Sequence, residues 1–173
     1  TLQRSTINGD VFDIAVKSYD FQAPIGQFGQ IRPHYHWLRR LNLFLEDFGG
    51  DLARMPAFLP ASNSVNPTNT SDLRWSVRSD GHSGFVFVNN YQRLQSMPEH
   101  RQVRFEVRLP NGMRATFPES PVTIPADSFF LWPFHWDLNG IRLLHATAQP
   151  LLKEENGEGG LTVVFAETPR VTA

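Results

Sequence analysis

The stretch "DLRWSVRSDGHSGFVFVNNY", residues 72–91, decides the fold class of this chain. Apolar and polar residues alternate through 72–79, and residues 84–91 are rich in β-branched and aromatic side chains. Turn-forming residues, Asp-Gly-His-Ser, separate the two runs. A two-residue period bounded by such residues is typical of strands that bury one face. The stretch therefore predicts two strands, 72–79 and 84–91.

The same pattern continues to the end of the chain. Six more short runs follow, separated by Pro, Gly, Asn and Asp, at 102–109, 113–117, 121–124, 128–132, 141–148 and 161–167. About eight strands at this spacing predict a mainly-β fold, an antiparallel β-sandwich. The dipeptide Asn111-Gly112 is a strong hairpin signal. We expect "KEENGEGG", residues 153–160, to form a solvated loop.

The first fifty residues have a different organisation. Residues 11–16 read as a strand, and 18–30 read as a loop because proline and glycine interrupt them. A helix is predicted over 33–48, where six apolar residues recur at steps of three and four, and Gly49 and Gly50 should end it. Those residues are Trp37, Leu38, Leu41, Phe44, Leu45 and Phe48. Three parts result: a strand-loop-helix unit at 1–50, a linker rich in Pro, Ser, Asn and Thr at 51–70, and a sandwich at 71–173.

The composition of the chain disfavours some classes of ligand and excludes some kinds of site. The chain has 173 residues, a net charge of −1 and no cysteine. A chain without an excess of positive charge is a poor partner for nucleic acid or an anionic membrane, so we expect a neutral carbohydrate as the ligand. Cysteine-based zinc sites, disulfides and thiolate nucleophiles are excluded. No secretion signal is visible, which leaves the compartment open, with periplasm or secretion compatible with the rest of the sequence.

Few residues carry the pattern of a catalytic or metal site. His34 and His36 lie two residues apart on a predicted helix and point to different faces, so we expect neither a metal nor a cofactor. Ser83 lacks the glycine spacing of a nucleophile elbow. Glycoside hydrolysis uses two carboxyl groups roughly 5–9 Å apart. Asp20 follows a strand end and is the candidate catalytic acid, but no second acid in the first fifty residues is similarly placed.

An aromatic cluster, "FFLWPFHWDLNG" at 129–140, allows two interpretations. Exposed tryptophan rings stack on the apolar faces of sugars, and buried ones fill sandwich cores. Trp132 and Trp136 are therefore either core residues or sugar-contacting residues.

The segment from Ser18 to Pro24 resembles the family 35 glycoside hydrolases, the β-galactosidase family. Members close a catalytic (β/α)8 barrel with a segment of the type S-Y-D-Y-D-A-P, a short glycine-containing loop and a helix; Ser18, Tyr19, Asp20, Ala23 and Pro24 match. "PHYHWLRRLNLFLEDFG" is similar to the last barrel helix. "GHSGFVFVNNYQR" and "FFLWPFHWDLNG" are similar to the β-domains that follow the barrel in bacterial members.

This resemblance implies a retaining galactosidase whose acid/base and nucleophile are two glutamates on earlier barrel strands, upstream of Thr1. Tyr19 and Phe21 would contact the sugar. The chain departs from the pattern at Phe21, where a sugar-contacting Tyr is common, and at Gln22, which replaces an acid. The absence of the tyrosine hydroxyl at position 21 would leave a sugar oxygen without its partner and weaken sugar binding by about 1 kcal/mol.

Three functional hypotheses follow. The first is a glycoside-hydrolase-related protein, with Tyr19, Asp20 and Phe21 at its site, acting on β-galactosides or similar sugars. The second is a non-catalytic carbohydrate-binding sandwich that uses Trp132 and Trp136. The third is an accessory domain that binds nothing by itself. An uncovered apolar stripe on the helix 33–48 also predicts a homo-oligomer.

Overall fold

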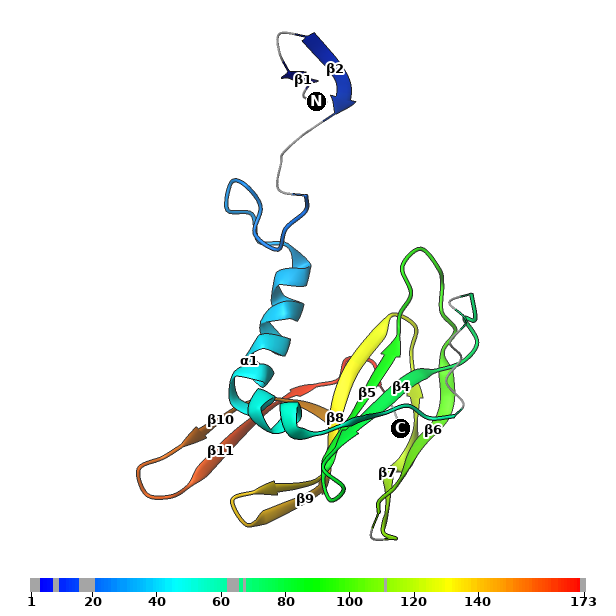
Figure 1. Ribbon diagram of the computed structural model, residues 1–173, viewed down its shortest axis with the longest axis vertical. Coiled ribbons are helices and arrows are strands. Elements are labelled where there is room, and N and C mark those ends of the chain that lie inside the picture. The colour runs from blue at the N-terminus through cyan, green and yellow to red at the C-terminus, as the bar shows by residue number, and fades with distance from the viewer. Residues whose placement is uncertain are drawn as a thin grey trace. The chain divides into compact units, whose positions relative to one another are not determined.

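The computed structural model describes the backbone of residues 4–7 and 10–15, and backbone and side chains of residues 21–61, 66, 68–110 and 112–171. The protein is mainly β with antiparallel sheets, and the described residues hold one α-helix (Figure 1). The chain divides into two compact units, residues 1–42 and 43–173, so the division falls within that helix, α1 (Pro33–Arg54). The fold class therefore agrees with the sequence pattern.

The first unit begins with an antiparallel hairpin of β1 (Arg4–Ile7) and β2 (Asp10–Ala15). The strand expected at 11–16 corresponds to β2. A short turn between Ile25 and Ile31, which form a β-bridge, leads into α1. Ser18, Tyr19 and Asp20 lie outside the described residues.

Helix α1 runs six residues beyond the end predicted at Phe48, so the prediction that Gly49 and Gly50 end it is wrong. Two apolar residues past the glycines, Leu52 and Met55, are buried. Their packing outweighs the low helix propensity of two glycines, which is about 1 kcal/mol each relative to Ala. The helix ends at Arg54, shortly before Pro56, and the first four residues of the expected linker 51–70 are helical.

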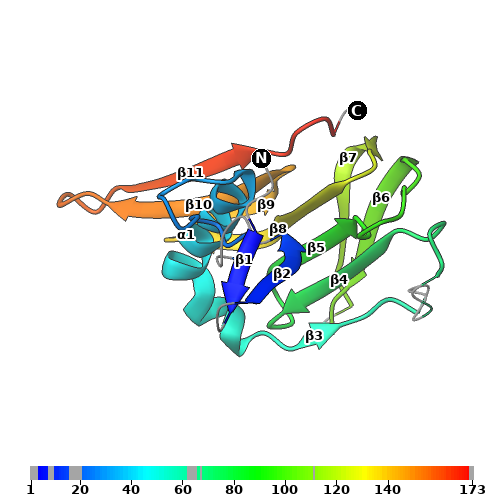
Figure 2. The ribbon, with the colours of Figure 1, turned by 90° about the horizontal axis from the view of Figure 1, so that it is seen from above.

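The second unit is a sandwich with two cores. One sheet has the order β3-β4-β5-β8-β9, and β6 and β7 form a separate antiparallel pair, as do β10 and β11. Figure 2 shows these layers from above. The bounds are β3 (Ala57–Phe58), β4 (Arg74–Ser79), β5 (Gly84–Asn90), β6 (His100–Arg108), β7 (Arg114–Ile124), β8 (Ser128–Leu138), β9 (Ile141–His145), β10 (Ala148–Glu155) and β11 (Leu161–Glu167).

The strand predictions differ from the structure in detail. The runs at 113–117 and 121–124 belong to one strand, β7, and the run at 141–148 divides between β9 and β10. Strand β10 continues to Glu155, so the loop expected at 153–160 is a tighter turn, closed by the hydrogen bond from the Asn156 N–H to the Gly160 carbonyl at 2.8 Å. The hairpin expected at Asn111-Gly112 joins β6 and β7, with Arg108 opposite Arg114.

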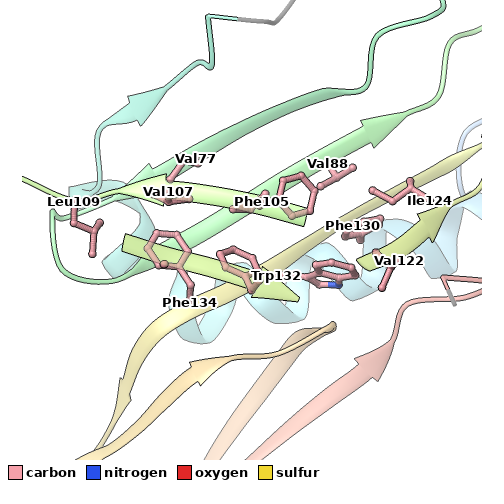
Figure 3. Packing of buried hydrophobic residues seen from close by; sticks show 13 residues of the cluster. Val77, Val88, Phe105, Val107, Leu109, Val122, Ile124, Phe130, Trp132 and Phe134 are labelled. Carbon is pink, nitrogen blue, oxygen red and sulfur yellow. The ribbon is translucent and has the colours of Figure 1, made fainter. Parts of the chain in front are cut away.

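Each face of the five-stranded sheet buries a separate core. On one face, side chains of β4, β5 and β8 meet those of β6 and β7, among them Phe105 and Trp132 (Figure 3). On the other face, Phe44, Phe48 and Leu52 of α1 pack against Phe85, Leu131 and Trp136. Strand β11 adds Val163 and Phe165 to this second core. The sheet is thus covered on both sides.

Candidate functional site

The segment that resembles the galactosidase motif continues into a described turn. Tyr19 and Asp20 are outside the described residues, so the roles predicted for them stay predictions. Phe21 is the first described residue after them. Its side chain is 82% exposed, and both Phe21 and Gln22 have positive φ, 48° and 61°. Two consecutive left-handed residues, neither of them glycine, turn the chain sharply just after Asp20.

Hydrogen bonds tie the Ala23-Pro24 end of this segment to the start of α1. The guanidinium of Arg32 donates to the carbonyl of Ala23, and the backbone N–H of Arg32 donates to the carbonyl of Pro24 at 3.0 Å. The N–H of Tyr35, in the first turn of the helix, donates to the Arg32 carbonyl at 2.9 Å. These contacts bring the two ends of the segment 23–32 together, so it is a closed turn.

The tip of this turn is also hydrogen-bonded. The N–H of Gly26 donates to the Gln30 carbonyl at 2.8 Å, and the N–H of Gly29 donates to the Gly26 carbonyl at 2.9 Å. Gly29 has a φ of +79°, which glycine adopts without the penalty that other residues incur. The side-chain Oε1 of Gln30 accepts the N–H of Phe28 at 3.0 Å. The tip therefore holds Phe28 outward, with its side chain 75% exposed.

Sequence reasoning did not single out Phe28. The signal was present in "GQFGQ", residues 26–30, because two glycines three residues apart favour a tight turn and place the intervening aromatic residue at its tip.

The two tryptophans predicted to contact sugar lie in the cores, which overturns that interpretation. Trp132 is fully buried, and its Nε1–H donates to the Oγ1 of Thr168 at 2.8 Å. Trp136 is 6% exposed and packs edge-on against Phe48 and Phe85, with ring centroids 4.8 and 5.5 Å away. A ring enclosed on both faces offers no surface on which a sugar can stack.

The acidic residues that follow the turn in sequence limit the reactions in which it could take part. From Phe21 to Asn42 the sequence contains no Asp or Glu. Further along α1, Asp47 accepts the backbone N–H of Lys153 at 2.8 Å, and Asp51 pairs with Arg54. These two acids thus have structural partners. The segment of the turn itself therefore supplies no carboxylate pair for hydrolysis.

The remaining candidates have structural roles. Ser83 lies in the turn between β4 and β5, where its Oγ donates to Asp80 Oδ2 at 3.2 Å. Partial burial acts to raise the pKa of Asp80, but hydrogen bonds from the backbone N–H groups of Ser83 and His82 outweigh it and leave that pKa lowered. Within the described ranges, no cluster of three or more His, Cys, Asp or Glu suits a metal ion.

The single described helix is not apolar enough over its length to span a membrane. No protein-family model matches this chain, and no curated protein is significantly similar to it.

Proposed function

We propose that this chain is the C-terminal part of a β-galactosidase-type retaining glycosidase, in which residues 18–32 border the sugar site. The observation that carries the proposal is the sequence Ser18-Tyr19-Asp20 followed by Ala23-Pro24, together with a hydrogen-bonded turn and a long helix. In barrels of this kind, the loops after the strands form the active-site face. A strand, a closed turn and a helix follow one another in the order of the last strand-loop-helix unit, although β2 pairs antiparallel with β1 and barrel strands pair in parallel.

In this proposal the chain supplies recognition. Asp20 accepts hydrogen bonds from sugar hydroxyls, because an ionised carboxylate is an acceptor only. Tyr19 and Phe21 provide aromatic surface next to it. The acid/base and the nucleophile are the two glutamates that the resemblance places on earlier barrel strands. This division of roles agrees with the lack of acidic residues between Phe21 and Asn42.

The alternative, a sugar-binding sandwich, loses the support of the two tryptophans named for it. It was based on Trp132 and Trp136, and both rings are buried in the cores. The aromatic side chains that are exposed on the sandwich are others, Phe58, Tyr91 and Phe129.

The experiment is a titration of the isotope-labelled chain with methyl β-galactopyranoside, followed by amide chemical shifts. We expect saturable shifts confined to residues 18–30. Removing the charge in Asp20→Asn should weaken binding at least tenfold, because hydrogen bonds to charged groups contribute about 1.5–3 kcal/mol.

Asp127→Asn is the matched control, since Asp127 is an exposed acid remote from the turn in sequence, and it should bind as the unaltered chain does. Shifts that do not saturate, or undiminished binding by Asp20→Asn, would refute the proposal.

A further inference from the structure

Strand β11 (Leu161–Glu167) has one edge with which no other described strand pairs. On its other edge it pairs with β10, which in turn contacts β8, so β11 is the outermost strand of this layer (Figure 2). The strand has seven residues, and from Leu161 to Ala166 it carries no charged residue and no proline. A long apolar strand with such an edge is a template for pairing with another strand.

Other strands at the ends of their sheets have features that discourage this kind of pairing. Strand β3 has only two residues, β9 carries Arg142, and β7 contains Pro118 and Pro121. Short strands, cationic side chains and prolines are devices by which natural sheets protect their edges. Residues 161–166 of β11 have none of these devices.

The direction of the backbone groups at this edge follows from one hydrogen bond. Lys153 of β10 is paired with Val163, yet its N–H donates to Asp47 Oδ2 at 2.8 Å and therefore points away from β11. In a non-hydrogen-bonded antiparallel pair, both residues turn their N–H and C=O groups away from each other. Val163 thus directs these groups to the outer edge, and so do Leu161 and Phe165, two residues to either side.

The sequence of β11 is complementary to itself. An antiparallel register that pairs all seven residues with those of a second copy places Val164 opposite Val164 and Val163 opposite Phe165. The outward N–H and C=O groups of Val163 and Phe165 then face one another across the pair. A β-branched residue beside an aromatic one is a favourable cross-strand pair, and Glu167 lies opposite the uncharged Leu161. The register therefore brings no like charges together.

We propose that β11 pairs edge to edge with β11 of a second copy of this chain, antiparallel and centred on Val164. Two β10-β11 hairpins then form one four-stranded sheet. The contact uses the same surface on both copies, so it closes at two chains. It is confined to one strand edge, and small interfaces of this kind are transient, so a crosslink is needed to trap it. The inference does not depend on the proposed function.

The test uses single cysteines in the full chain, which has none of its own. In the proposed register the two Val164 residues form a non-hydrogen-bonded pair with Cα atoms about 4.5 Å apart, which suits a disulfide. Val164→Cys should therefore form a disulfide-linked dimer on mild oxidation. Thr162→Cys is the matched control, because residue 162 is also exposed but its two copies would lie about 14 Å apart.

We expect the Val164→Cys dimer to form roughly tenfold faster than the Thr162→Cys dimer on non-reducing gels, since the second separation is too long for a disulfide. Equal rates, or no dimer from Val164→Cys, would overturn the inference. Adding Leu41→Glu, which alters the apolar stripe of α1, should leave the Val164→Cys rate unchanged. A loss of crosslinking there would assign the contact to the helix instead.

A second measurement does not depend on disulfide chemistry. The amide resonances of residues 161–167 should shift with concentration in the unaltered chain. Val164→Lys and Val164→Glu each place like charges opposite one another, so each alone should lose these shifts, and an equimolar mixture of the two should regain them. Shifts that persist in either variant alone, or that the mixture does not restore, would contradict the proposed pairing.

Discussion

At the residue scale, the hydrogen bond between Trp132 and Thr168 gives a direct test of the first core. The Thr168 side chain is buried, and its Oγ1 accepts the indole N–H while donating to the Thr147 carbonyl at 3.2 Å. Thr168→Val keeps the shape of the side chain but leaves a buried donor unsatisfied. We expect the free energy of unfolding to fall by about 1–3 kcal/mol in urea denaturation.

Thr168→Ser retains the hydroxyl and serves as the comparison. It should lose less stability than Thr168→Val, because only a methyl group is removed. Equal losses for the two variants would show that packing, rather than the hydrogen bond, fixes this position.

The face of β8 on which Trp136 lies could not be predicted from the sequence. Strict alternation along β8 would put Trp136 on the same face as Phe130, Trp132 and Phe134. It instead lies in the opposite core, with Leu131. His135 has a φ of +49°, which breaks the alternation between Phe134 and Trp136. Such a local break depends on backbone geometry, and the sequence pattern holds no clear sign of it.

At the element scale, the sequence predicted where most strands lie. It did not predict where one strand ends and the next begins. The sequence pattern located β4, β5, β6 and β11 because each is a short run rich in apolar and β-branched residues that ends at turn-forming residues, and β5 is buried on both faces. The pattern did not show that 113–124 is a single strand, since Pro118 and Pro121 interrupt it in sequence. It also placed the end of α1 too early at two glycines. Burial outweighed local propensity at the end of α1, and the two prolines of β7 lie where its register with β6 shifts.

The position of Gly50 inside α1 leads to a prediction for the stability of the protein. A Cβ built at Gly50 meets no atom within 4 Å, and the backbone there is helical. Gly50→Ala should raise the free energy of unfolding by about 0.5–1 kcal/mol, because alanine loses less conformational freedom in a helix.

The contrasting variant is Gly84→Ala. A Cβ at this position would lie 2.2 Å from the Arg78 carbonyl oxygen and 2.9 Å from the Phe134 ring, so this substitution should destabilise the sandwich. Both are measured by urea denaturation. A loss of stability in Gly50→Ala would contradict the helical account of 49–54.

At the scale of the whole molecule, the apolar stripe of α1 bears on assembly. Leu38, Leu41 and Leu45 are 44%, 40% and 41% exposed and recur at steps of three and four. This spacing is typical of the seam between paired helices. We propose that two copies of the chain associate through it, and sedimentation velocity should detect a dimer at high concentration.

Leu41→Glu should shift that equilibrium to monomer, because it places a charge in the seam. Leu59→Glu, at a residue that is 72% exposed outside the helix, should leave it unchanged. A monomer at every concentration for the unaltered chain would refute the association.

The candidate site was predictable only in part. Its proposed location at Tyr19, Asp20 and Phe21 rests on the sequence resemblance, and the closed turn after these residues agrees with the glycines and proline there. Phe28 was not singled out, because the exposure of its side chain is not given by the sequence. Trp132 and Trp136 were open to two interpretations for the same reason.

The central claim is that residues 18–32 recognise a galactosyl unit, and the most direct test is calorimetric titration with two epimers. Methyl β-galactopyranoside and methyl β-glucopyranoside differ only in the orientation of one hydroxyl group. We predict saturable heat with the galactoside and at least tenfold weaker binding of the glucoside, since a site built to hydrogen-bond one hydroxyl leaves a polar group unpaired with its epimer. Equal binding of both epimers, or of neither, would contradict the claim.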